Sequence, residues 1–209
     1  MGQQGSKPPD RGEMAAKTGV FALRDNGLTV VPDKVWGIAN LRTLDLSQNK
    51  LLKLPDKINV HSKLKTLALD SNKLSDLPDV LCELKELHSL SVAHNALTVL
   101  PDALGALSKL KTLVVSHNKL ASLPESMCAL ASLAQLDASS NALSKLPAGF
   151  GVLAQLAVVD LSNNRLGGVC RTPCDPDTRR LERALNPGVI PRPQHKASQK
   201  LLHLGRTPR

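Results

Sequence analysis

The sequence predicts an α/β solenoid, in which short parallel strands line a concave sheet and each coil of the chain takes up 23 residues. Three repeated features support this prediction: an asparagine, a set of apolar residues between successive asparagines, and a proline after each set. The asparagine recurs at the same interval in all seven copies, as Asn26, Asn49, Asn72, Asn95, Asn118, Asn141 and Asn164. A fixed period of this kind is typical of stacked coils that contact only their neighbours.

Each coil is predicted to begin with a short strand, because apolar and polar residues alternate ahead of the asparagine. Residues 43–47 read Thr-Leu-Asp-Leu-Ser, and neighbouring side chains of a strand point to opposite faces. The leucines therefore face the core and the polar residues face solvent. The asparagine amide both donates to and accepts from backbone groups. We therefore expect the seven asparagines to form a structural ladder between the coils.

The second half of each coil begins with a Pro-Asp-x-apolar segment, as in residues 55–58. Proline cannot pair inside a sheet, so it favours an extended or turning entry to the convex side. A leucine that continues the period is expected to close the core there, as Leu84, Leu107, Leu130 and Leu153. Burial of one such leucine contributes roughly 1.5–3 kcal/mol, so a coil is stable only when neighbours cover both of its flanks.

The two ends of the array depart from the repeat. Thr18 replaces the first leucine of the N-terminal coil, and residues 10–17 are expected to form a short helical turn over the exposed core edge. Cys170 stands where a proline is due, and no further copy follows. The predicted solenoid therefore covers residues 13–169. It lies between a disordered segment, residues 1–12, and a mostly disordered Pro- and Arg-rich tail, residues 170–209, with a helical turn at residues 177–185.

The basic character of the chain belongs mostly to its tail. From Arg165 onward there are ten Lys or Arg and three Asp or Glu, whereas residues 1–164 carry seventeen and fifteen. Whole-chain charge is therefore a poor indicator of the repeat surface, and we expect no nucleic-acid partner. No apolar run approaches the roughly 18 residues of a membrane span, and the N-terminus lacks the apolar stretch of a secretory signal. These features predict a cytosolic protein.

No constellation of residues indicates catalysis or metal binding. The sequence contains no nucleophile with a placed base and no Gly-rich phosphate loop. Cys170 and Cys174 lack two further ligands for zinc. His94 and His117 hold the same position in adjacent coils, about 5 Å apart, but lack a third ligand. We therefore expect a protein that is not an enzyme and that holds no metal or other cofactor.

The first residues carry the one motif with chemistry attached. Residues 1–6, Met-Gly-Gln-Gln-Gly-Ser, fit the M-G-x-x-x-[ST] pattern of N-myristoylation, with Gly2 as the acylated residue. A single myristoyl chain attaches only marginally, with a partition constant of about 10⁴ M⁻¹, so stable anchoring needs a second signal. The basic tail is one candidate, through contact with anionic lipids; a solvated tail is the alternative.

The pattern L-x-x-L-x-L-x-x-N-x-L resembles the leucine-rich repeat. With its Leu-Pro step, the chain is similar over residues 13–166 to intracellular leucine-rich-repeat proteins of the Ras-suppressor type. Residues 17–28, Lys-Thr-Gly-Val-Phe-Ala-Leu-Arg-Asp-Asn-Gly-Leu, are similar to the entry coil of one member of that family. The resemblance implies a non-enzymatic, membrane-associated binding module. It also implies an unidentified cytosolic partner from the small-GTPase or phosphatase networks that related repeats serve.

The predicted concave face is polar, with small residues and scattered acids. Its candidate binding residues are Asp45, Asp70, Ser91, Ser116, Asp137 and Asp160. Interface hot spots favour Trp, Tyr and Arg, which the strand centres lack, so we expect a partner that supplies the large side chains and a basic patch. A solvated face without a partner stays open.

Two functions follow from these features. The first is a lipid-anchored adaptor or scaffold that recruits a signalling protein through the concave face. The second is a soluble isoform with a truncated array, whose basic tail makes the contacts.

Overall fold

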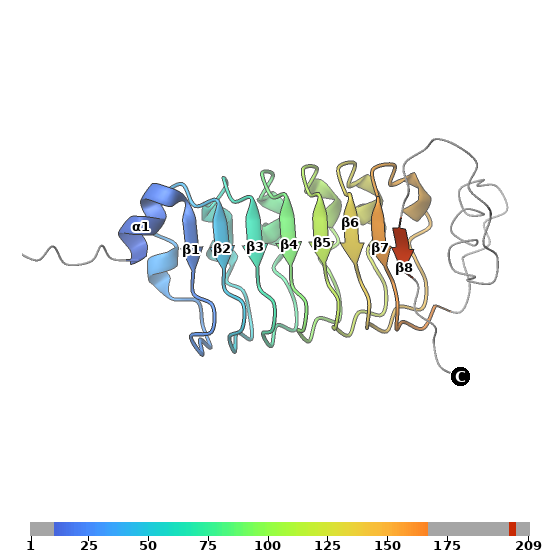
Figure 1. Ribbon diagram of the computed structural model, residues 1–209, viewed down its shortest axis with the longest axis horizontal. Helices are drawn as coiled ribbons and strands as arrows, with labels where there is room; N and C mark the ends of the chain where they lie inside the picture. The colour runs from blue at the N-terminus through green and yellow to red at the C-terminus, as the bar shows by residue number, and fades with distance from the viewer. Residues whose placement is uncertain (1–10, 167–200, 204–209) are drawn as a thin grey trace, which may run out of the picture.

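Eight short parallel strands lie side by side in one sheet, in the order in which the chain visits them (Figure 1). The computed structural model describes residues 11–166 and 201–203. The α-helix α1 (Arg11–Thr18) precedes the first strand. The strands are β1 (Val20–Ala22), β2 (Thr43–Asp45), β3 (Thr66–Ala68), β4 (Ser89–Ser91), β5 (Thr112–Val114), β6 (Gln135–Asp137), β7 (Val158–Asp160) and β8 (Leu201–His203). The prediction of a solenoid with a parallel sheet is confirmed.

Between each pair of consecutive strands from β1 to β7, the opposite side of the coil carries a short 3-10 helix. These turns are η1 (Asp33–Val35), η2 (Asp56–Val60), η3 (Asp79–Glu83), η4 (Leu104–Ala106), η5 (Glu125–Ala129) and η6 (Phe150–Val152). Prolines with extended backbone precede several of them, such as Pro55 with φ −65° and ψ 147°. Because its ring fixes φ and it has no N–H, proline ends the extended segment and leads into the turn.

The strands pair in a register that advances by one repeat from coil to coil. Leu44 of β2 is opposite Leu67 of β3, and Leu90 of β4 is opposite Leu113 of β5. After the strand, each coil turns through a residue with positive φ, between 52° and 56°, immediately before the ladder asparagine; these residues are Asp25, Gln48, Ser71, His94, His117, Ser140 and Asn163. Identical turns in every coil keep the strands aligned.

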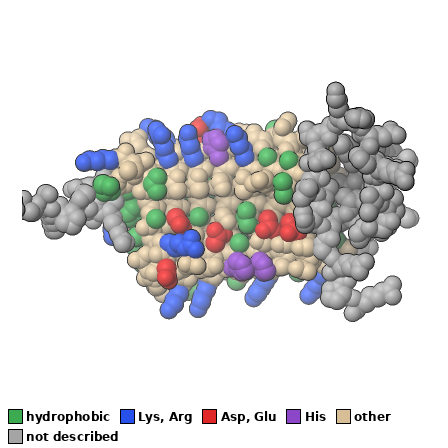
Figure 2. Space-filling view, viewed as in Figure 1, with side chains coloured by type: hydrophobic (Ala, Val, Ile, Leu, Met, Phe, Trp, Pro, Cys, Tyr) green, Lys and Arg blue, Asp and Glu red, His purple; other side chains and the backbone are tan. Residues whose placement is uncertain are grey.

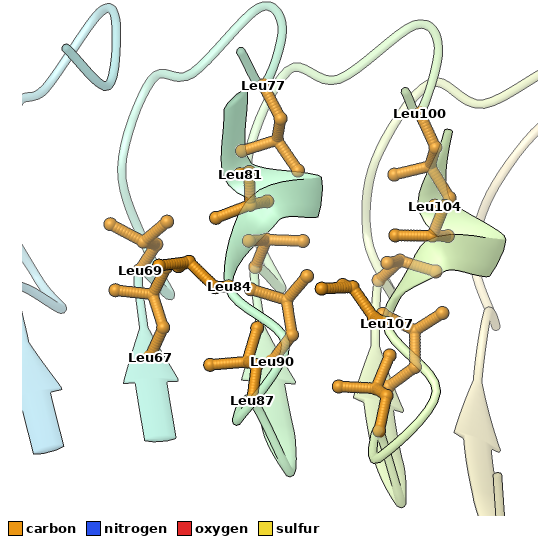
Figure 3. Packing of buried hydrophobic residues seen from close by; sticks show 14 of the residues in the cluster. Leu67, Leu69, Leu77, Leu81, Leu84, Leu87, Leu90, Leu100, Leu104 and Leu107 are labelled. Atoms are coloured by element: carbon orange, nitrogen blue, oxygen red, sulfur yellow. The ribbon is translucent and has the colours of Figure 1, made fainter. Parts of the chain in front are cut away.

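The core is a continuous column of leucines between the sheet and the 3-10 turns. Figure 3 shows leucines from strands and from convex segments of adjacent coils pointing toward one another, including Leu67, Leu84 and Leu107. The four leucines expected to close the core from the convex side are buried: Leu84, Leu107 and Leu130 are 0% exposed and Leu153 is 3% exposed. Each coil therefore buries its apolar residues against its neighbours.

Helix α1 covers the first coil. It spans residues 11–18, where a turn over residues 10–17 was expected, and its Ala15 is 1% exposed. Thr18 does not pack like the leucine it replaces, because its Oγ1 donates a hydrogen bond to the Met14 carbonyl (2.9 Å) at the end of the helix. No helix in the described part of the chain is long and apolar enough to cross a bilayer.

At the other end, β8 pairs in parallel with β7. This strand comes from the tail, where the sequence shows no repeat and we expected mostly disorder. Strand pairing at a sheet edge satisfies backbone N–H and C=O groups, so it needs no leucine pattern that the sequence would reveal. The helical turn expected at residues 177–185 lies outside the described residues, as do Gly2, Cys170 and Cys174.

Candidate protein-binding face

A ladder of asparagine amides fixes the ends of the strands that carry the concave face. Asn118 is representative: its Nδ2 donates to the Val92 carbonyl of the preceding coil (2.9 Å) and to the Val115 and Ser116 carbonyls of its own coil (3.0 and 3.1 Å). Its Oδ1 accepts from the Leu97 N–H (3.0 Å). The same arrangement joins coils at Asn49, Asn72, Asn95, Asn141 and Asn164. Backbone groups that would otherwise be unpaired in the interior are thereby satisfied.

Asn26 differs from the other six asparagines because its coil has no preceding coil. It is exposed, and its Nδ2 donates to the Arg24 carbonyl of its own coil (2.7 Å). It takes part in the ladder through its backbone N–H, which donates to Asn49 Oδ1 (3.1 Å). The ladder therefore begins with the side chain of Asn49.

Three of the four predicted acidic residues occupy one strand position and make the same local contact. Oδ1 of Asp45, Asp137 and Asp160 accepts a hydrogen bond from the N–H of the serine two residues later, at 2.9, 3.0 and 2.9 Å. The three carboxylates are half-buried. This contact fixes their orientation on the face before any partner arrives.

Asp70 occupies the next outward position and contacts the neighbouring coil. Its Oδ1 accepts from Ser91 Oγ and from the Ala93 N–H (2.8 Å). Two residues of the predicted set, Asp70 and Ser91, are therefore joined to each other. The set is less uniform than the sequence suggested, because Ser116 is only 4% exposed. Its position lies next to the turn, where Ser47 and Ser139 are buried as well.

The acidic residues cluster most closely at β6 and β7. Asp137 and Asp160 are register partners on these adjacent strands. Like charges directly opposite each other in a sheet destabilise it. Figure 2 shows acidic side chains along the middle of this face, with two groups close together near the C-terminal end of the described coils. A cation bound between Asp137 and Asp160 would relieve their repulsion.

His94 and His117 stack on each other at one side of the face. Their ring centroids are 4.1 Å apart and the ring planes differ by 10°. Imidazole lone pairs lie in the ring plane, so two stacked parallel rings do not direct their nitrogens at one shared metal ion. In the described part of the chain, no group of three His, Cys, Asp or Glu is placed to hold a metal.

The described cysteines are unlike reactive thiols. Burial raises the pKa of the Cys82 thiol, and the nearby Asp79 carboxylate raises this pKa further. Burial also raises the pKa of Cys128, with a smaller contribution from Glu125. Both residues hold the neutral thiol form at neutral pH, whereas a nucleophilic cysteine needs a lowered pKa.

Basic residues border the face on both sides, and the predicted face of small residues and scattered acids did not include them. Arg42, Lys65, His88 and Lys111 directly precede β2, β3, β4 and β5, whereas Lys50, Lys73, Lys119 and Arg165 follow the ladder asparagines. Figure 2 shows most Lys and Arg side chains along the upper and lower margins of the face and most acidic side chains between them, with one basic group among the acids toward the N-terminal end and one acidic group at the upper margin. The signal in the sequence was the 23-residue recurrence of cations just outside each strand.

Comparison with known proteins agrees with this architecture. The model of the leucine-rich repeat matches residues 39–97, 62–120, 85–143 and 108–166. These matches together span residues 39–166, more than half of the 209-residue chain. The chain belongs to the leucine-rich repeat family. Leucine-rich-repeat domains are generally modules for protein–protein interaction. The search of curated proteins found no match.

Two solved structures illustrate the similarity. A leucine-rich-repeat protein of Leptospira interrogans is 28% identical, with a TM-score of 0.53; the match covers 75% of this chain and 52% of the other. The plant peptide hormone receptor RGFR1, in complex with RGF2, is also 28% identical, with a TM-score of 0.60 and coverage of 67% and 23%. This chain therefore spans about half of the first protein and under a quarter of the second.

Proposed function

We propose that this leucine-rich-repeat protein is a non-enzymatic adaptor that binds a basic surface of a protein partner on its concave face. The observation that carries the proposal is the placement of Asp137 and Asp160 as register partners, each held through Oδ1 by a serine N–H. Because the two carboxylates are already oriented, they can bind a Lys or Arg of a partner with little further loss of side-chain conformational entropy. Asp45 and Asp70 extend the same acidic band toward β2 and β3.

The band determines the kind of partner. Small side chains such as Ala68, Ser91 and Val114 separate the acids, and the face presents no Tyr or Trp in its strands. A partner therefore has to supply the large side chains of the interface. The plant receptor among the similar structures was solved with RGF2 bound, which supports protein or peptide ligands as the class to test first.

The test neutralises the acids and leaves their local hydrogen bonds possible. We expect the double variant Asp137→Asn and Asp160→Asn to keep Oδ1 as an acceptor and to lose on the order of fivefold or more in affinity for a Lys-rich peptide. The matched control is Asp79→Asn with Asp102→Asn, two exposed acids on adjacent coils of the convex side. Peptide binding is measured by fluorescence anisotropy, and proximity labelling in cells compares the neighbours of each variant. The proposal would be contradicted if the acid-to-Asn variant of the concave face and the convex control variant had the same affinity for the peptide and the same labelled neighbours in cells.

We also propose that the adaptor is of the intracellular Ras-suppressor type and lies on the cytosolic side of a membrane, held by a myristoyl group on Gly2. The Met-Gly-x-x-x-Ser start supports the lipid, and the Leu-Pro step supports the family assignment. Small-GTPase and phosphatase signalling proteins are the partner classes that this assignment favours.

Mass analysis tests the tether. Intact protein from cells with N-myristoyltransferase should carry the 14-carbon acyl group on Gly2, and Gly2→Ala should not. Membrane flotation should follow the same difference. An unmodified or acetylated N-terminus removes the tether from the proposal and favours the soluble isoform whose basic tail makes the contacts.

A further inference from the structure

The upper margin of the concave face carries a regular row of basic residues, Arg42, Lys65, His88 and Lys111, called here the basic row. The backbone holds the row in register: the Lys65 N–H donates to the Arg42 carbonyl (2.7 Å), the His88 N–H to the Lys65 carbonyl (2.8 Å) and the Lys111 N–H to the His88 carbonyl (2.8 Å). One basic side chain therefore emerges per coil, about 4.8 Å from the next. The row extends for about 14 Å across β2–β5.

The charges of the basic row are available to a partner. Arg42, Lys65 and Lys111 are exposed, and His88 is half-buried with Nδ1 2.6 Å from the Glu86 carbonyl. Within residues 11–166 none of the three cations forms a salt bridge, whereas Lys109 pairs with Glu86 and Lys57 with Asp33. Glu86, the salt-bridge partner of Lys109, also interacts electrostatically with Lys65 and His88. With three cations and this one neighbouring carboxylate, the row keeps a net positive charge.

The length of the row matches a short extended peptide. About five residues of extended chain span the row, at about 3.4 Å per residue, and alternate side chains of such a chain point the same way. Acidic side chains at alternate positions recur about every 6.8 Å, so about three of them would lie along the four residues of the row. The long side chains of Arg42, Lys65 and Lys111 bridge the difference in spacing. A carboxylate-rich strand is therefore matched to this edge both in charge and in length.

A nucleic acid fits the same edge less well. Sequence-independent binding of single strands combines a basic groove with aromatic rings on which bases stack. The outward strand positions beside the row are Thr43, Thr66, Ser89 and Thr112, which offer no ring. Asp45 lies one outward position further along β2, where it would repel a wide polyanion. The narrow basic row beside an acidic band favours a peptide.

We propose that the basic row docks an extended acidic segment of the protein partner whose basic surface occupies the acidic band. This inference rests on the proposed function, because it divides one partner between two adjacent bands of the same face. Opposite charges in parallel bands fix the orientation and register of the partner, since a partner turned around would meet like charges.

The experiment measures binding of two labelled peptides to the full chain by fluorescence anisotropy. One peptide of about twelve residues alternates Glu and Thr, and the other alternates Lys and Thr. The test variant is Lys65→Glu with Lys111→Glu. The control is Lys73→Glu with Lys119→Glu, which changes the same net charge in the same two coils on the opposite margin, where both lysines are exposed as well.

We expect the test variant to bind the acidic peptide about tenfold or more weakly than the unchanged protein, and the control variant to lose less than about threefold. Equal losses in the two variants would show an effect of net charge alone and would overturn the proposal. Unchanged affinity in the test variant would also overturn the proposal, because the acidic peptide would then bind elsewhere on the protein. Tighter binding of single-stranded DNA than of the acidic peptide, at the same salt concentration, would overturn it as well.

The basic peptide separates this inference from the proposed function. Suppose that the affinity for the Lys-Thr peptide depends on Asp137 and Asp160, whereas the affinity for the Glu-Thr peptide does not depend on Lys65 and Lys111. The inference about the basic row is then wrong, and the proposed function of the acidic band is retained. If the Glu-Thr peptide depends on the row and the Lys-Thr peptide does not bind, the proposed function fails. Circular dichroism of each variant shows that the fold is retained.

Discussion

His61 is a titratable side chain buried in the core of the repeat. It occupies the repeat position held by Leu84 and Leu107, it is 5% exposed, and its Nε2 has no hydrogen-bond partner among the described residues. Its ring lies 5.9 Å from the ring of Trp36. Burial lowers the pKa of His61 below its ordinary value of 6.5, and a hydrogen bond with the Val35 backbone opposes this shift.

The lowered pKa predicts a loss of stability in mild acid. Below pH about 6.5 the unfolded chain binds a proton at His61 more readily than the folded chain, so the free energy of unfolding falls as pH decreases; above that pH, His61 contributes no dependence. We expect His61→Leu to remove this part of the pH dependence and to raise stability at pH 5.5. Chemical denaturation at pH 5.5 and 7.5, followed by the fluorescence of Trp36, the single tryptophan of the sequence, checks this.

His94→Asn is the matched control for His61. His94 is exposed at a φ of 54°, which asparagine tolerates better than most residues. The control should retain the full loss of stability in acid. An unchanged pH dependence in His61→Leu would show that other groups cause the loss.

The hydrogen bonds of the ladder asparagines predict that single substitutions in the ladder lower the stability of the protein. Asn118→Ala removes four hydrogen bonds and leaves the Leu97 N–H and several carbonyls without this partner. We expect a loss of about 2 kcal/mol or more in the free energy of unfolding, because unsatisfied buried groups cost about 1–3 kcal/mol each. Asn26→Ala, at the exposed first position, should cost under about 1 kcal/mol. Equal losses in urea denaturation would refute the role assigned to the ladder.

At the scale of elements, close packing of the 3-10 turns leaves no room for a side chain at Gly105. A Cβ on Gly105 of η4 would lie 2.0 Å from the Ser126 carbonyl oxygen of η5. The two turns would have to separate, which typically costs about 1–3 kcal/mol for an overpacked site. We expect Gly105→Ala to destabilise the protein by that amount.

Gly37→Ala serves as the control for the same change. The nearest atom to its added Cβ is the Lys34 carbonyl oxygen at 3.7 Å, an ordinary contact. Its stability should stay within about 1 kcal/mol of the parent, or increase slightly through the lower entropy of the unfolded chain. Thermal melts of the two variants make the comparison, and a similar shift in both would show that η4 and η5 can separate without cost.

At the scale of the whole molecule, each coil depends on its neighbours. Strand contacts join only consecutive members of the sheet, β1 to β2 and onward, so stability is a sum of coil and interface contributions. We expect amide hydrogens of β4, which has three strands on one side and four on the other, to exchange more slowly than those of β1. Hydrogen exchange followed by mass spectrometry checks this, and uniform protection along the array would indicate one indivisible cooperative unit.

Much of this fold is predictable because the same pattern of apolar residues and asparagine recurs in seven copies. Leu44 and Leu67 alternate with polar residues in the period of a strand, and the positions of Asn49 and Asn72 define where each strand ends. The candidate face was predictable only in part. Asp45 and Asp137 were visible as outward residues, but the burial of Ser116 depends on the turn beside it.

The sequence by itself determined the period, the parallel sheet and the leucine core, because these depend on contacts that recur identically in every coil. Tertiary structure alone decided the pairing of β8 with β7 and the stacked geometry of the His94 and His117 rings. These features arise between residues 23 or more positions apart. Their geometry follows from how closely the coils stack, and no single copy of the repeat contains that information.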